Sequence, residues 1–88
     1  MTATTESQDL ARLRAAQAWF DVEIAPCPRS DEWKAGARAG VWKAHGLRPM
    51  PSAWPSGSAQ GDAWRAGYSA GLVMACHDLA RAAQKAAA

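Results

Sequence analysis

Two cysteines and two histidines are the residues from which metal or acid–base chemistry could start in this 88-residue sequence. They are Cys27, His45, Cys76 and His77. A structural zinc site needs such ligands at close, characteristic spacings, and none of those spacings is present. Cys76 and His77 are neighbours, so on a helix they point about 100° apart and make poor co-ligands. The sequence therefore predicts no metal site and no cofactor.

Catalysis needs a nucleophile beside a base, paired carboxylates or a metal ion, and none of these arrangements is apparent. We expect His45 at a helix end and His77 on an exposed helical side, as surface or capping residues. Cys76 is expected beside an apolar helical face, where a cysteine packs as a small hydrophobic residue. The glycines are expected within helices, so they form no phosphate-binding loop. These patterns favour a protein that is not an enzyme.

A strip of basic side chains is the feature that does suggest binding. On a helical wheel, Lys34, Arg38 and His45 lie within roughly 40° of one another. Trp42 stands beside them, and cations with an aromatic ring for stacking are the usual means of sequence-independent RNA or DNA binding. The alternative is an ordinary solvated face. The candidate partner-binding residues are Lys34, Arg38, Trp42, Lys43, His45, Arg48 and Trp54.

The composition predicts an all-α fold. Alanine, the best helix former, is abundant, valine and isoleucine are scarce, and no stretch alternates as a half-buried strand would. Three helices are expected, at about residues 5–24, 31–45 and 61–85. The first should begin with a capping box of Thr5 and Gln8 and should end before Pro26. Ser30 should cap the second helix, and Gly46 should stop it.

The chain is expected to form one compact domain with two parts. Residues 1–28 make an N-terminal helix and a proline connector, and residues 29–88 make a two-helix module whose Pro-rich linker covers residues 47–59. Two arginines and four carboxylates give the first part a net charge of −2, and eight Lys or Arg and four carboxylates give the second +4. The balance permits an anionic partner without requiring one.

An internal repeat joins the second and third helices. Asp31-Glu-Trp33-Lys-Ala-Gly36-Ala-Arg-Ala-Gly40 matches Asp62-Ala-Trp64-Arg-Ala-Gly67-Tyr-Ser-Ala-Gly71. A glycine within a helix costs about 1 kcal/mol against alanine, so four of them need a structural reason. Glycines spaced by four lie on one face and let a second backbone come close. We therefore expect a closely packed helical hairpin in which each Trp ring covers the other helix's glycines.

The residues assigned to this packed core share the repeated face. They are Trp33, Gly36, Gly40, Trp64, Gly67, Tyr68 and Gly71. The alternative is that one groove between a ring and its glycines stays open for a partner. Trp19, Trp42 and Trp54 are left outside the core.

Two segments of the repeat also carry a family resemblance. The first is Gly36-Ala-Arg-Ala-Gly40, which fits a G-x-x-A-G helix, and the second is Trp64-Arg-Ala-Gly67-Tyr68, which fits a helix opening on two aromatic residues around a glycine. On these motifs, residues 33–70 resemble the ribosome modulation factor family. The resemblance implies two helices around a Pro-containing linker and binding to the small ribosomal subunit. Pro49-Met50-Pro51 stands where that family has a Pro-Tyr element.

Several function classes compete on the sequence alone. The first is an RNA- or ribosome-associated module that uses the basic strip. The second is a small protein–protein inhibitor or adaptor, of the kind that phages and mobile elements direct against host nucleoprotein complexes, anti-CRISPR proteins included. It is favoured by the small size, the weak charge and five Trp, which together with Arg are common interface hot spots. The third is a symmetric homodimer.

The location of the protein is inferred from its ends and its cysteines. The N-terminus is polar and acidic, unlike a signal peptide, and the longest apolar stretch is too short to span a bilayer. Two lone cysteines without a secretion signal are typical of reduced cytosolic thiols. We expect a cytoplasmic protein with no membrane contact.

Overall fold

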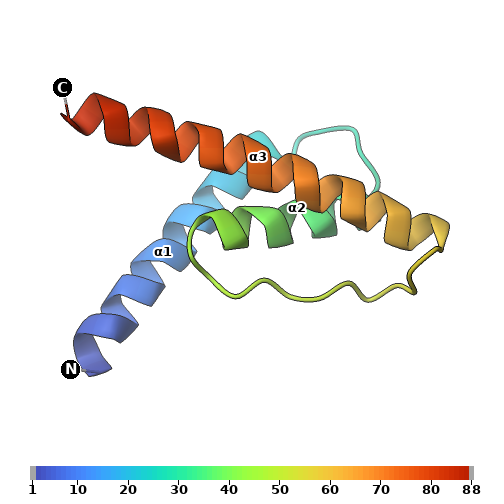
Figure 1. Ribbon diagram of the computed structural model, residues 1–88, viewed down its shortest axis with the longest axis horizontal. Helices are drawn as coiled ribbons and strands as arrows, with labels where there is room; N and C mark the ends of the chain where they lie inside the picture. Colours follow the sequence, from blue (N-terminus) through green and yellow to red (C-terminus); the bar gives the residue numbers. More distant parts are fainter. Residues whose placement is uncertain (1, 88) are drawn as a thin grey trace.

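Three helices make up the fold. The computed structural model describes the backbone of residues 2–87 and the side chains of residues 7–87. The helices are α1 (Thr2–Glu23), α2 (Asp31–Ala44) and α3 (Ala59–Ala87), shown in Figure 1. No strand occurs between residues 2 and 87, which confirms the predicted all-α class. None of these helices combines the length and the apolar character that a bilayer crossing requires.

The first helix begins earlier than the sequence predicts. The expected start was Thr5, but helical backbone extends back to Thr2, and the side chains of the expected capping box up to residue 6 lie outside the described ones. Neither Ala3 nor Thr4 breaks a helix, so nothing in these residues opposes the extra turn. The end agrees closely, because α1 stops at Glu23, ahead of Pro26.

The second helix has the caps that its sequence predicts. The hydroxyl of Ser30 accepts a hydrogen bond from the backbone N–H of Trp33 at 3.2 Å. At the other end, Gly46 has a φ of +78°, and the N–H of Leu47 donates to the carbonyl of Trp42 at 2.9 Å. A left-handed glycine with this long-range backbone bond is a Schellman stop, which fixes where the chain leaves α2.

The third helix also begins earlier than expected. Ser58 caps it, since its hydroxyl accepts from the N–H of Gly61 at 3.0 Å and its carbonyl accepts from Asp62 at 2.9 Å. Helix start signals favour Asp near the first turn as well as Ser at the cap, and here Asp62 lies within the helix while Ser58 is the cap. The helix therefore gains residues at its start and runs on to Ala87.

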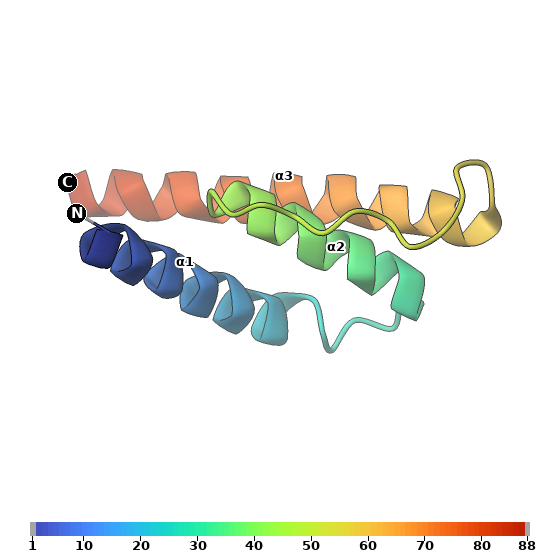
Figure 2. The ribbon, with the colours of Figure 1, turned by 90° about the horizontal axis from the view of Figure 1, so that it is seen from below.

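The two helices of the repeat are parallel, which corrects the predicted hairpin. An αα-hairpin is antiparallel, but both views show α2 and α3 running in the same direction (Figures 1 and 2). The connecting residues 45–58 therefore return along the whole length of α2 before α3 begins. The two copies of the repeat are thus related by an approximate two-fold rotation that exchanges α2 and α3.

The four glycines of the repeat lie where α2 meets α3, and all four are buried. A Cβ on Gly36 would overlap the backbone of Trp64, and a Cβ on Gly67 would overlap the backbone of Trp33. One turn further on, Gly40 faces the backbone of Tyr68 and Leu72, and Gly71 faces that of Ala37. The predicted close packing is present, but each glycine meets the other helix's main chain, not a Trp ring.

A small core connects this pair to α1. The fully buried side chains are Ala16, Ile24, Ala37, Val41 and Ala75. The indole N–H of Trp19 on α1 donates to the Asp78 carboxylate on α3 at 2.9 Å, which ties the first helix to the third. Figure 2 shows α1 beside α2, with its N-terminal part and the C-terminal part of α3 extending past the core. Side chains 7–15 and 79–87 are all exposed.

Replacing Gly67 by alanine tests the backbone contact, because the contact decides whether this change raises or lowers the free energy of unfolding. On an exposed helix this change would stabilise by about 1 kcal/mol. Here the methyl group overlaps the Trp33 carbonyl, so we expect a loss of about 2 kcal/mol and a thermal midpoint lower by roughly 10 °C. The matched control is Ala66→Gly at the exposed neighbour, which should cost only about 1 kcal/mol. A raised midpoint for Gly67→Ala in circular dichroism would rule out the close approach.

Candidate functional site

Two members of the predicted basic strip are bonded to the chain itself. Lys34 Nζ donates to the carbonyl of Ala25 at 2.7 Å, and the side chain is half-buried. His45 Nδ1 lies 2.9 Å from the carbonyl of Val41, which requires the proton on that nitrogen. Lys34 thus holds the connector after α1 against α2, and His45 lies at the end of α2. The strip is not a row of free cations.

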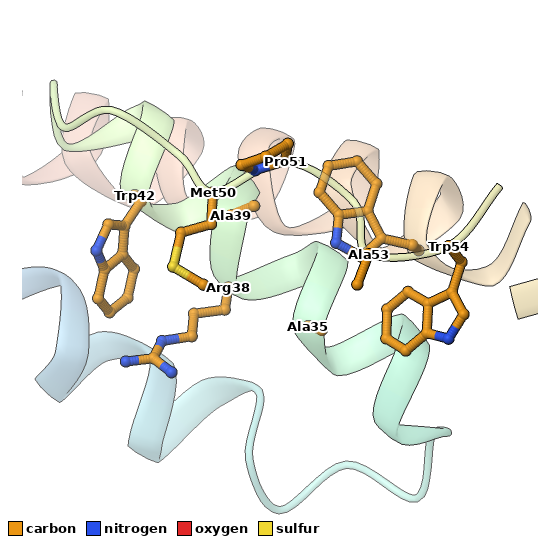
Figure 3. A pocket seen from close by; sticks show the side chains of 9 residues that line it. Ala35, Arg38, Ala39, Trp42, Met50, Pro51, Ala53 and Trp54 are labelled. Atoms are coloured by element: carbon orange, nitrogen blue, oxygen red, sulfur yellow. The ribbon is translucent and has the colours of Figure 1, made fainter. Parts of the chain in front are cut away.

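Arg38 is the best-placed cation of the strip. Its guanidinium carbon lies 4.8 Å from the ring centroid of Trp42, within cation–π range. Its Nη2 also donates to Gln17 Oε1 of α1 at 3.0 Å. The side chain as a whole is exposed. These contacts orient the guanidinium, which Figure 3 draws beside the Trp42 ring, and they use only part of its donors.

Lys43 and Arg48 complete the basic surface from either side of the α2 terminus. Both are exposed, and neither has an ion pair among the described side chains. Lys43 follows Trp42 on α2, and Arg48 precedes Met50 in the linker. Both charges therefore lie at or just after the C-terminal end of α2.

A cleft of about 260 Å³ lies next to Arg38, between α2, the linker and α3. Its lining is mostly aromatic, aliphatic or small (Figure 3). The lining residues are Ala35, Arg38, Ala39, Trp42, Met50, Pro51, Ala53, Trp54 and Trp64. Among the residues predicted to contact a partner, the structure brings Arg38, Trp42 and Trp54 together here.

Trp54 reaches the cleft because a local turn holds its backbone. The hydroxyl of Ser52 accepts from the N–H of Trp54 at 3.1 Å, and it lies 3.2 Å from the Trp54 carbonyl. Such a Ser turn is a common way to fix a linker residue without regular structure. The ring is half-buried at the opposite end of the cleft from Trp42 (Figure 3).

Trp64 is a cleft residue, although the sequence placed it in the core. Its ring stacks on Tyr68 with centroids 5.4 Å apart and planes at 16°, and both rings are half-buried outside the core cluster. The reason is the backbone of Trp64 itself, which lies against Gly36 and leaves no space for an indole between the helices. The glycines at the helix contact leave no space for a large ring there, and this is the signal in the sequence that could have placed the Trp64 ring outside.

The other Trp rings also differ from their predicted positions. Trp33 is half-buried, packs against the core and lies under the Arg29 guanidinium at 4.9 Å. Trp19 and Trp42, expected outside the core, are half-buried against it. The helical wheel of each helix alone does not include the packing of the helices on one another, which half-buries these rings.

The cysteines and histidines form no metal or acid–base site in the described part of the chain. Cys27 donates to the carbonyl of Glu23 at 3.3 Å, and both Cys27 and Cys76 are free thiols. His77 is exposed on α3. Among the described side chains, residues 7–87, no three His, Cys, Asp or Glu gather as metal ligands would. The cleft is therefore the arrangement with the most binding potential.

No protein-family model matches this chain, and neither a curated protein nor a solved structure is significantly similar to it. The function is therefore inferred from the cleft and from the residues that line it.

Replacing Lys34 separates a structural lysine from a binding one. Lys34→Met keeps the aliphatic stem but removes the bond to the Ala25 carbonyl, so we expect a loss of about 1 kcal/mol and a midpoint lower by roughly 5 °C. Lys43→Met, at an exposed position of the same helix, is the control and should stay within about 0.5 kcal/mol. An unchanged midpoint for Lys34→Met would return Lys34 to the binding surface.

Proposed function

We propose that this protein is a non-catalytic binding module whose cleft receives part of a partner protein. The observation that carries this proposal is the convergence of Trp42, Trp54 and Trp64 with Arg38 and Met50 around one concave surface. Trp and Arg are the residue types that most often dominate binding energy, and Met is enriched at interfaces. A pre-formed aromatic cleft also limits the entropy that is lost on binding.

The charges of the surface also favour a protein over a polyanion. Binding to nucleic acid depends on several cations that each meet a phosphate. Lys34 and His45 already bond to backbone carbonyls, and Arg38 gives one donor to Gln17. Three cations of the predicted set remain, and only one of them, Arg38, lines the cleft beside three Trp rings. This balance supports an interface with an apolar centre and a basic edge.

The module is interpreted as an inhibitor or adaptor that acts on a larger complex, in the manner of phage or mobile-element proteins such as anti-CRISPR proteins. The cleft gives such a module a recognition surface. The basic edge near Trp42 suits a nucleoprotein target, because its charge is attractive to the nucleic acid beside the bound protein.

Binding to RNA, including a ribosomal site, is the second candidate. The specific observation for it is the Arg38 guanidinium over the Trp42 ring, with exposed Lys43 and Arg48 at or just after the C-terminal end of the same helix. An aromatic ring next to cations is how single strands are bound without sequence preference. The resemblance to the ribosome modulation factor family supports the same candidate.

An affinity capture with and without nuclease, run on three forms of the full chain, distinguishes these candidates. Trp54→Ala removes a cleft ring, and Val73→Ala, at a side chain 67% exposed on α3, is the matched control. If a protein docks in the cleft, its recovery resists nuclease, survives Val73→Ala and falls about 30-fold with Trp54→Ala. Nuclease-sensitive recovery of ribosomal components, with RNA affinity falling steeply as salt rises, would instead select RNA binding.

A further inference from the structure

The hydrogen-bonding side chains of the cleft are nearly all donors. They are the indole N–H groups of Trp42, Trp54 and Trp64 and the guanidinium of Arg38. The other lining side chains come from alanine, proline and methionine, and the thioether of Met50 is only a weak acceptor. No carboxylate, amide or hydroxyl lines the cleft. An occupant that satisfies these groups has to bring acceptors and needs few donors of its own.

These indole donors are not used within the described part of the chain. None of the three forms a hydrogen bond with residues 7–87, whereas the indole of Trp19 is bonded to Asp78 at 2.9 Å. A half-buried Trp ring usually finds a partner for its N–H. No buried side-chain nitrogen or oxygen among the described residues lacks a partner, so these indole N–H groups reach solvent and can donate to acceptors of a partner. Figure 3 draws the ring nitrogens of Trp42 and Trp54 on the edges that face away from the space between the two rings.

The dimensions favour an extended segment over a folded surface. The cleft measures about 260 Å³, which is below the roughly 300–1,000 Å³ of typical small-molecule sites. It has space for one or two side chains between the Trp42 and Trp54 rings, which Figure 3 shows at opposite ends. An extended segment that crosses these rings would fill the space with one side chain after another.

The protein's own linker gives an example of such a segment on this face. Residues 47–58 carry prolines at 49, 51 and 55 and run along α2 without regular structure (Figures 1 and 2). Pro51 and Met50 of this linker already form one wall of the cleft. The outer face of α2 therefore accepts an extended, proline-rich chain.

We infer that the cleft binds an extended, proline-containing segment of the partner protein that also carries a carboxylate. Proline has no backbone N–H but keeps its carbonyl, so a proline-rich strand presents acceptors to donor groups. Its polyproline II conformation is pre-formed, and aromatic-lined grooves recognise it for that reason. This inference rests on the proposed function, since it names the part of the partner that docks.

The carboxylate is assigned by the charge around the cleft. Arg38 is the only charged lining residue, and it has donors left beyond its bond to Gln17. Residues 29–88 carry a net charge of +4, which attracts an acidic segment. A guanidinium can hold a carboxylate by two parallel hydrogen bonds, which fixes the register of the strand.

A peptide titration of the full chain tests this inference. The probes are a synthetic peptide that alternates proline with aspartate, a second with alanine in place of every proline, and a third with serine in place of every aspartate. A fourth probe is an oligouridylate. The readout is the set of five indole N–H signals in a ¹H–¹⁵N spectrum, one for each Trp, with affinity taken from Trp fluorescence.

The expected result is saturable binding of the proline–aspartate peptide. The indole signals of Trp42, Trp54 and Trp64 should shift, and that of Trp19 should not change. The alanine and serine peptides should each bind about tenfold more weakly. Arg38→Gln should remove the preference for aspartate. Arg65→Gln should keep it, because Arg65 bonds to Ser56 outside the cleft lining. Both variants should retain the wild-type thermal transition.

Other outcomes overturn the inference in distinguishable ways. Equal affinity for the alanine and proline peptides would rule out proline recognition and leave the protein-binding function in place. Oligouridylate that shifts the cleft signals while every peptide fails would overturn the inference and the proposed function together. If no probe moves the three cleft signals, the cleft is not a binding site for any of these ligands.

Discussion

The contact between the backbones of α2 and α3 is the constraint on which the rest of this structure depends. Because Gly36 faces the Trp64 main chain and Gly67 faces the Trp33 main chain, the helices meet without side chains between them. One turn further on, Gly40 meets the Tyr68 main chain and Gly71 meets that of Ala37, so the contacts advance together along both helices and the pair is parallel. A parallel pair in turn obliges the linker to return along α2, and this return forms one wall of the cleft. The packing thus determines where a ligand can bind.

The sequence predicts the elements of the fold better than their mutual arrangement. Caps at Ser30 and Gly46 are local signals, and the structure has both of them. The close approach of the helices also follows from the spacing of the glycines. Helix direction does not, because glycines at i and i+4 permit parallel and antiparallel crossings alike. The length of the linker, residues 45–58, was the remaining clue, because an extended chain of this length is long enough to return along α2, whereas a helical hairpin needs only a few connecting residues.

The candidate site could be predicted only in part, and for a related reason. The wheel of α2 places Arg38 and Trp42 on one outer face, and they are in contact at 4.8 Å. It cannot reveal that Lys34 bonds to the carbonyl of Ala25, because that bond depends on the path of the connector after α1. Nor does the periodicity of α3 show that Trp64 turns outward. Charges and rings on one face become a site only after the chain's own hydrogen bonds have been assigned.

The parallel arrangement has a consequence for the kinetics of folding. In a hairpin the contacts nearest the turn are local and can form first, after which the pair zips closed. Here even the first contacts of the crossing join residues that are far apart in the sequence. Gly36 and Trp64 are 28 positions apart, and Trp33 and Gly67 are 34 positions apart. No short loop exists from which the pair could grow, so the chain must close a long loop before any of these contacts is gained. For an all-helical chain of this size, slow folding is expected, because contact order sets the rate more strongly than helix content does.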